Sequence, residues 1–285
     1  MPYKIRNISG FRYCKCLGLK NETEKLDFLF KRNLYKYMNM ENAIRSLDGG
    51  YLFFQEPSNW ADGFEKWFYN ANYDAFPDGR NLSPKMFACC FTFNQSSEAA
   101  WNTYSYDNKG LASRCVQFVL YRKRLRMCFE QYAKAQKDKM FFYEGKVNYS
   151  IPSDIIQRMH EPSTDAVIQD LHQQYFDKHT FGKNKYISTL LIKRPAFEYE
   201  NEVRFLFENI DNTKKDINNP ENVMIPVNWR EVIIKILVEE TCTNVEFEIF
   251  RRECNRICKK NGWPEFTIER SNLHAKDLKP AIIKP

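Results

Sequence analysis

Residues 34–57, LYKYMNMENAIRSLDGGYLFFQEP, predict a strand, a helix and a second strand in direct succession. The aromatic residues that open the stretch are typical of a strand. Residues 40–47 have helical patterning, Asn39 is positioned to cap the first turn, and the glycines at 49–50 stop the helix. Residues 51–55 then form the second strand. This unit predicts a fold in which helices and strands are intermixed.

Outward from this unit, the predicted elements follow no regular strand–helix–strand rhythm. Further strands are predicted at residues 86–93, 115–121, 140–149, 203–207, 223–227, 232–238 and 266–269. Helices are predicted at 98–106, 122–137 and 245–260, and a loop with an aromatic-rich turn is predicted at 59–69. This order favours an α+β fold, with a mixed or antiparallel sheet and flanking helices, over a doubly wound fold.

The domain organisation is predicted to be simple. No internal repeat or low-complexity linker divides the 285 residues, so we predict a single domain over 1–285 with its core in 33–270. Residues 150–182 are predicted to be a helical insertion, and the tail 278–285 to be loosely ordered. The 15% aromatic content is typical of a folded chain.

The sequence shows no targeting or membrane-spanning segment. Residues 1–10 lack the apolar core of a signal peptide, and no run of about 18 apolar residues occurs. We therefore expect a cytoplasmic protein with no membrane partner, whose nine cysteines are free thiols. The alternative is a zinc site formed by Cys14, Cys16, Cys254 and Cys258. Their spacing matches no standard zinc pattern, so no metal cofactor is predicted.

The positive charge of the chain is concentrated in one region. Residues 111–140 contain eight basic residues against two acidic ones, within a net charge of +7. The predicted helix 122–137 carries a basic cluster, and a patch of this kind can bind nucleic acid. The candidate nucleic-acid-binding residues are Arg122, Lys123, Arg124 and Arg126. The alternative interpretation is a solvated helix face that binds nothing.

Several common catalytic motifs are missing from the sequence. It contains no G-x-x-x-x-G-K-[ST] phosphate loop, no G-x-G-x-x-G, no H-E-x-x-H and no G-x-S-x-G. Four histidines are present, and no local signature indicates a Ser-His-Asp triad. These absences count against kinases, P-loop ATPases and zinc proteases of the H-E-x-x-H type.

Three stretches within 33–240 contain recognisable motifs in a defined order. The first runs from the strand 34–37 and helix 40–47 to GYLFF at 50–54 and P-x-x-W-x-D-x-F-E at 57–65. The second comprises C-F-T at 90–92, W-x-x-Y at 101–104 and N-K-G at 108–110. The third comprises Lys193, F-x-Y-E-x-E-x-R at 197–204 and the strand 232–238. Together these stretches resemble the bacterial domain-of-unknown-function family 2971.

The order of these elements is also similar to that of ADP-ribosyltransferases. This resemblance implies a split sheet and a bound NAD lying across the split, where NAD is a substrate. Tyr35 or Lys36, then Thr92 with Tyr104, and then Glu202 occupy the matching positions. Glu200-x-Glu202 resembles the E-x-E pair of some transferases.

The resemblance assigns a role to each candidate residue. Trp101 or Tyr104 offers an aromatic face for the nicotinamide. Glu202 holds the ribose hydroxyls and stabilises positive charge in the transition state, and Glu200 orients or deprotonates the acceptor. Arg204 or Lys36 pairs with the pyrophosphate.

Structural interpretations of the same residues stay open. Strand alternation places Glu200, Glu202 and Arg204 on one face, and a charged face of an exposed strand needs no function. Trp101 and Tyr104, three residues apart on a helix, are more typical of a core than of a stacking platform.

The leading functional prediction is an NAD-dependent ADP-ribosyltransferase, acting as a toxin or anti-phage effector on nucleic acid or protein and restrained by a protein partner such as an antitoxin. One alternative is a non-catalytic protein that binds nucleic acid or a partner through 122–137. Another is a metal-dependent nuclease that uses Asp62, Glu65, Glu200 and Glu202.

Overall fold

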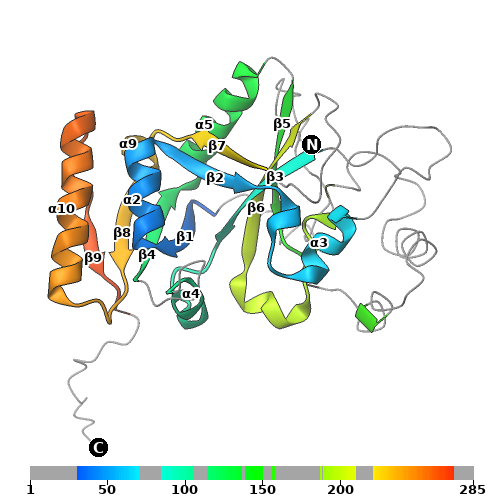
Figure 1. The fold of residues 1–285 in the computed structure, drawn as a ribbon, viewed down its shortest axis with the longest axis horizontal. Coiled ribbons are helices and arrows are strands. Elements are labelled where there is room, and N and C mark those ends of the chain that lie inside the picture. The colour runs from blue at the N-terminus through cyan, green and yellow to red at the C-terminus, as the bar shows by residue number, and fades with distance from the viewer. Residues whose placement is uncertain are drawn as a thin grey trace, which may run out of the picture.

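The computed structural model describes residues 31–70, 85–105, 114–136, 139–149, 156–157, 187, 189–209 and 221–272. The strands are β1 (Asn33–Asn39), β2 (Tyr51–Gln55), β3 (Lys85–Thr92), β4 (Cys115–Tyr121), β5 (Met140–Lys146), β6 (Glu202–Asn209), β7 (Asn222–Pro226), β8 (Ile233–Val238) and β9 (Ile268–Arg270). The helices are α2 (Met40–Gly49), η1 (Pro57–Asn59), α3 (Gly63–Asn70), α4 (Glu98–Tyr104), α5 (Arg122–Ala135), η2 (Pro195–Glu200), α9 (Trp229–Val232) and α10 (Asn244–Asn261). The predicted mixed fold with flanking helices is confirmed (Figure 1).

The strand–helix–strand unit at the start of the described region forms as predicted. The side chain of Asn39 accepts a hydrogen bond of 2.8 Å from the backbone N–H of Asn42, which caps α2. Gly50 adopts φ 68°, a left-handed conformation that favours glycine and ends the helix. Strand β2 follows at once, so the chain reverses within two residues of the helix end.

The prediction of a loop over 59–69 is wrong, because most of this stretch is helical. Helix α3 begins at Gly63, and the side chain of Asp62 accepts a hydrogen bond of 2.9 Å from the N–H of Phe64. Tyr69 is fully buried, and Trp60 and Trp67 pack against the same cluster. Packing of these aromatic side chains therefore stabilises a helix that local propensity did not predict.

The sheet is largely antiparallel, with one parallel pair of strands at one end. Its order is β5-β6-β3-β1-β4-β8-β9, and only the β8–β9 pair among the described strands is parallel. Strand β2 branches off this path, because it pairs with β3 at a single position, Gln55 opposite Ala88, and with β7 along its whole length. Figure 1 shows β8, β9 and α10 at the end of the molecule opposite to α3.

The sheet is split between β1 and β3. These two neighbours share one register position, Tyr35 opposite Thr92, although β3 pairs with β6 and β1 with β4 along their full lengths. Beyond that position, the ammonium of Lys36 reaches across and donates a hydrogen bond of 2.9 Å to the backbone carbonyl of Cys90. At the split, the Lys36 side chain thus makes one of the hydrogen bonds between β1 and β3 in place of the backbone.

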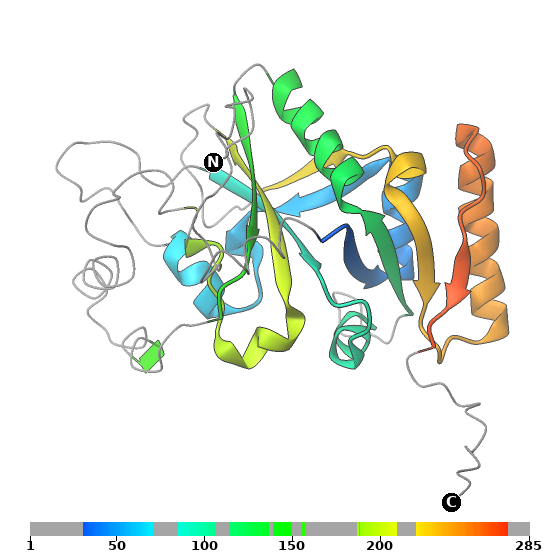
Figure 2. The same cartoon turned by 180° about the vertical axis from the view of Figure 1, so that it is seen from behind.

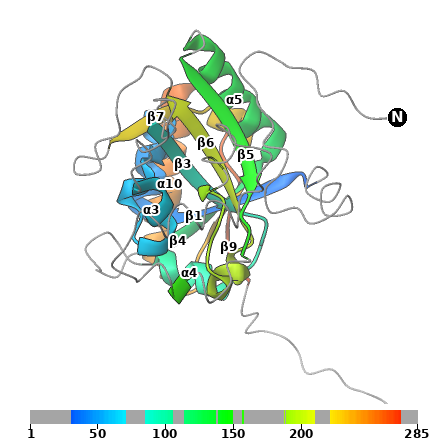
Figure 3. The same ribbon diagram turned by 90° about the vertical axis from the view of Figure 1, so that its right-hand side faces the viewer.

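The two faces of the sheet are covered differently. Helices α2, α5, α9 and α10 pack on one face and enclose the largest core, which includes Phe129, Phe205 and Phe207. Helix α3 covers part of the other face through Tyr69, and α4 covers a separate part of it through Trp101. Figure 3 shows α3 and α5 on opposite sides of β3 and β6, and Figure 2 shows α5 beside β5.

Two predictions about the chain fall beyond what the structure describes. Most of the predicted helical insertion, 150–182, lies outside the described residues, and so does the tail 278–285. In the parts that are described, none of the helices has both the length and the apolar character required to cross a membrane.

Candidate functional site

The candidate site lies on the sheet face that α3 and α4 share, where β3 ends and β6 begins. Thr92 stands opposite Glu202 in the β3–β6 ladder and opposite Tyr35 in the single β1–β3 pair. Two positions further into β3, Cys90 stands opposite Arg204. Residues from three separate segments therefore lie side by side at the split. Tyr35, Thr92 and Glu202 form one row across the strands, and Cys90 and Arg204 form the next.

A tight turn brings Glu200 to the same place. Helix η2 ends at Glu200, and the next residue, Asn201, has φ 43°, a left-handed conformation that asparagine tolerates better than most residues. The hydroxyl of Thr92 donates a hydrogen bond of 2.5 Å to the carbonyl of Glu200, and the amide of Asn94 donates one of 2.6 Å to the carbonyl of Tyr199. Two hydrogen bonds therefore fix the turn to the end of β3 just before β6 begins.

Arg204 holds Glu202 from the adjacent position on the same strand face. Its Nε lies 2.8 Å from Oε1 and its Nη2 lies 3.0 Å from Oε2 of Glu202, which is a bidentate arrangement. The guanidinium also bonds Glu65 and the carbonyl of Leu190, and it stacks 4.3 Å from the Trp60 ring. Arg204 is 1% exposed, so the prediction that it pairs with a pyrophosphate is wrong.

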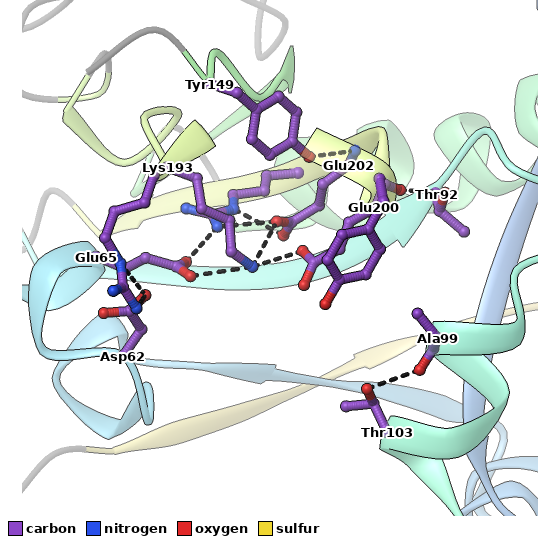
Figure 4. A network of polar contacts seen from close by, with 12 residues as sticks. Asp62, Glu65, Thr92, Ala99, Thr103, Tyr149, Lys193, Glu200 and Glu202 are labelled. Carbon is purple, nitrogen blue, oxygen red and sulfur yellow. Dashed lines mark hydrogen bonds and ion pairs between the residues drawn. The ribbon is translucent and has the colours of Figure 1, made fainter. Parts of the chain in front are cut away.

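Lys193 connects three carboxylates. Its Nζ lies 3.0 Å from Oε1 of Glu65, 2.5 Å from Oε2 of Glu200 and 3.4 Å from Oε2 of Glu202 (Figure 4). Three carboxylates therefore share two cations, Lys193 and Arg204. No role was predicted for Lys193 from the sequence, although the residue stands in the third stretch that resembles family 2971.

The pKa values of the two glutamates of the E-x-E pair are shifted in opposite directions. Burial by itself raises the pKa of Glu202, but the charges and hydrogen bonds of Arg204 and the charge of Lys193 outweigh it and hold the pKa at about 2. Burial raises the pKa of Glu200 above its ordinary value, and the hydrogen bond from Lys193 only partly opposes this effect. Two carboxyl groups with separated pKa values are typical of acid–base assignments in active sites.

The expectation of an exposed charged strand is wrong. Strand β6 does alternate, because Val203, Phe205 and Phe207 face the large core while Glu202 and Arg204 face the other side. That other side is covered by α3 and by the segment that contains Leu190 and Leu191. The charged residues are buried there and must be paired, and among them Glu200 alone retains substantial exposure, with 29% of its side chain accessible.

The aromatic candidates have different environments. Trp101 is 6% exposed and meets Tyr37 edge-on at 5.1 Å between ring centroids, so it is a core residue and does not offer a face to nicotinamide. Tyr104, one turn later on α4, is 41% exposed and stacks on Tyr37 at 6.2 Å. Tyr35 is buried beside the split, and Lys36 is half-buried. Only Tyr104 of the two predicted platforms has an accessible ring.

The backbone N–H of Glu202 is also held. It donates a hydrogen bond of 2.7 Å to the hydroxyl of Tyr149, which stands beyond the end of β5. Figure 4 shows Tyr149 on one side of Glu202 and Thr92 beside Glu200. Tyr149 was missed because nothing in the sequence indicates that β5 and the start of β6 meet.

The predicted basic face of α5 is smaller than expected. Arg122 is 4% exposed and pairs with Glu144 at 2.6 Å, so it is not part of a nucleic-acid-binding surface. Arg126 pairs with Glu130, and Arg124 pairs with Glu231 across to α9. Lys123 is exposed, and no ion pair involves it in the part of the chain that the structure describes. The helix offers a partly neutralised surface.

The structure bears on both metal hypotheses. Cys254 and Cys258 are buried free thiols on α10, whereas Cys14 and Cys16 lie outside the described residues. Among the described side chains, no group of three or more His, Cys, Asp or Glu is arranged to hold a metal ion. Asp62 pairs with Arg194 at 2.8 Å, separately from the glutamates that the nuclease hypothesis joins to it.

Comparisons with known proteins return a family match and weak structural similarities. The model of a family described as "Protein of unknown function (DUF2971)" matches residues 100–205, which confirms the resemblance to family 2971 over that part of the chain. No curated protein matches. A structure titled "Thermus sp. 2.9 DarT in complex with ADP-ribosylated ssDNA" is 12% identical, with 85% of this chain and 94% of that chain covered and a TM-score of 0.35.

A second structure from the same organism, "Thermus sp. 2.9 DarT in complex with NAD+", gives nearly the same values. It is 12% identical, with 85% and 96% covered and a TM-score of 0.34. Similarity at this level establishes neither a shared fold nor a shared activity.

Proposed function

We propose that this chain is an NAD-consuming ADP-ribosyltransferase whose reaction takes place at the split between β1 and β3. The observation that carries the proposal is the Glu200–Glu202 pair. The two carboxylates stand two residues apart at the start of β6, share Lys193, and have pKa values shifted in opposite directions. One is fixed as an anion, and the other is more exposed and takes up a proton more readily.

Transfer of ADP-ribose from NAD to an acceptor can use two such groups. When the bond between nicotinamide and ribose breaks, its electron pair leaves with the nicotinamide, and positive charge develops on the ribose as an oxocarbenium. Glu202 stays ionised and is held by Arg204, so its charge needs no reorganisation during the reaction. The cluster contains three carboxylates and two cations, and its excess negative charge favours a cationic transition state.

Glu200 is suited to the second half of the reaction. An acceptor hydroxyl or amine forms the new bond to the ribose carbon, and its proton must go to a base. Glu200 is anchored through its Oε2 to Lys193, and the side chain remains 29% exposed. It can therefore accept this proton while Glu202 stays behind it, buried and ionised.

Lys36 and Tyr104 are the proposed contacts for the rest of NAD. The ammonium of Lys36 bonds the Cys90 carbonyl and lies 5.4 Å from the Phe91 ring, and no carboxylate of a described residue pairs with it. A half-buried cation of this kind suits a pyrophosphate. The exposed ring of Tyr104 suits nicotinamide stacking. Tyr35 and Thr92 line the split between Lys36 and Tyr104.

The acceptor is proposed to be nucleic acid or protein. On α5, Lys123 would contribute to a nucleic-acid contact because it is exposed, and Arg124 would contribute by giving up its exposed ion pair with Glu231. The role as a toxin or anti-phage effector, and a restraining protein partner, stay predictions from the sequence.

The test measures NAD binding by calorimetry and nicotinamide release by the wild type, Glu202→Gln and Glu200→Gln. Glu202→Gln is expected to lower nicotinamide release by about 10²–10³-fold with little change in the dissociation constant for NAD. Glu198→Gln is the matched control, because Glu198 is an exposed carboxylate on the same turn. The proposal fails if the wild type does not bind NAD at millimolar concentration, or if Glu202→Gln retains turnover.

A further inference from the structure

Glu65 joins the two cations that hold the glutamate pair. Its Oε1 lies 3.0 Å from Nζ of Lys193, and its Oε2 accepts a hydrogen bond from Nη2 of Arg204. Each cation contacts a different member of the E-x-E pair most closely. Arg204 donates hydrogen bonds to both oxygens of Glu202, and Lys193 makes its shortest contact with Glu200. Glu65 is itself 8% exposed and comes from α3, far away in the sequence.

We propose that Glu65 is a positioning residue for the reaction, acting as a carboxylate bridge that keeps Lys193 and Arg204 on their separate partners. This inference rests on the proposed function and extends it to a residue that does not touch the substrate. Because α3 has no other carboxylate in the cluster, the bridge also fixes where α3 stands relative to the start of β6.

The bridge matters because Lys193 is shared. Its ammonium serves Glu65, Glu200 and Glu202 at once. If Glu65 loses its charge, its repulsion of Glu200 is removed, and the ammonium is free to approach the two remaining carboxylates more closely. Glu200 is then held more firmly as an anion and becomes a weaker base toward an acceptor proton.

The charges around Glu200 also connect its pKa to Glu65. Glu65 and Glu202 both raise the pKa of Glu200 through their negative charge, whereas Lys193 lowers it. Among the described residues, Tyr104 from α4 and Tyr149 after β5 also interact with Glu200. Cys90 and Lys36 interact in turn with Tyr104. Glu65 is therefore the group on α3 through which that helix influences the proposed base.

The test compares Glu65→Gln and Glu65→Asp with the wild type in nicotinamide release across pH 4–9. Glu65→Gln is expected to lower kcat by about 10-fold or more, to leave KM within about 2-fold, and to move the acidic limb of the profile to lower pH. Glu65→Asp keeps the charge on a shorter side chain and is expected to restore the position of the acidic limb. Glu198→Gln, which removes an exposed carboxylate near Glu200, is the control.

A second measurement separates this inference from the proposed function. The carboxyl carbon of Glu200 is titrated by ¹³C NMR in the wild type and in Glu65→Gln, without NAD. A lower pKa of Glu200 in the variant supports the bridge even if the wild type releases no nicotinamide, in which case only the proposed function fails. An unchanged pKa of Glu200 together with an unchanged acidic limb overturns the bridge, as does a loss of kcat that follows only the loss of folded protein in thermal melts.

Discussion

Two buried ion clusters on the same sheet differ in their balance of charge. The cluster at the split contains Glu65, Glu200 and Glu202 against Lys193 and Arg204. The cluster between α5 and β5 contains Glu144, which lies 2.6 Å from Arg122 and 3.8 Å from Arg126, and Glu130, which lies 3.3 Å from Arg126. The cluster at the split therefore has an excess of acid, whereas the two carboxylates and two cations of the other cluster are balanced.

The clusters also differ in their contact with solvent. In the α5–β5 cluster, the side chains of Glu144 and Arg122 are 0% and 5% exposed, and Arg122 further bonds backbone carbonyls near the start of the described chain. At the split, Glu200 retains 29% exposure. Burial of charge is thus common to both, and only the split combines buried charge with an accessible carboxylate and an unmatched negative charge. We infer that this combination distinguishes a reactive site from a structural ion pair.

The largest effect is expected from Arg204→Met. The change leaves Glu202 and Glu65 buried with one cation between them, and breaking a buried pair in this way costs about 3–5 kcal/mol. The free energy of unfolding from denaturant titration is expected to fall by this amount, and nicotinamide release to be lost. Arg204→Lys is expected to rescue little, because an ammonium cannot make the bidentate contact. A loss below about 1 kcal/mol would contradict the importance assigned to this pair.

Glu144→Gln is expected to separate stability from activity. It leaves Arg122 buried without its carboxylate, which costs about 3 kcal/mol. Nicotinamide release per folded molecule is expected to stay at the wild-type rate, because this cluster lies on the other face of the sheet from the proposed site. Measuring both quantities on one preparation checks the comparison. A selective loss of turnover in well-folded protein would show that the two clusters are not independent.

The sequence predicted the elements better than their contacts. Strand β2 and strand β4 have the predicted bounds, because strong aromatic or β-branched runs are closed by turn residues or by the basic start of α5. Helix α3 was missed because burial of Tyr69 stabilises it, and burial is a property of the whole fold. The resemblance assigned Thr92 and Glu202 to one site, and in the register of β3 with β6 these two residues stand opposite one another.

The pairings inside the site were beyond the reach of the sequence. Arg204 meets Glu65 across 139 positions of chain, and no local pattern announces such a contact. For the same reason, Arg204 was assigned to a pyrophosphate although it is enclosed, and Arg122 was assigned to nucleic acid although it is anchored to Glu144. A basic or acidic residue type indicates that a partner is needed, and only the fold decides whether the partner is internal.

The smallest effect, and the one with the opposite sign, is expected from Glu200→Gln. Because the pKa of Glu200 is raised on folding, its contribution to stability is complete below the unfolded pKa of about 4.3 and is lost as the pH rises through the folded pKa. At pH 7 the ionised carboxyl therefore lowers the stability of the fold. A neutral amide leaves two carboxylates for two cations, so the free energy of unfolding is expected to rise by up to about 1 kcal/mol.

The pH dependence of that gain is its control. The difference in melting temperature between Glu200→Gln and the wild type is expected to be largest near pH 7 and to shrink toward zero below about pH 4, where wild-type Glu200 is already protonated. Glu144→Gln, by contrast, is destabilising at pH 7. If Glu200→Gln were destabilising at pH 7 as well, the acid-rich cluster would be an ordinary structural network like that of Glu144, and the functional contrast between the two clusters would disappear. A gain in stability accompanied by lost nicotinamide release is the pattern of a residue kept for chemistry at a cost to the fold.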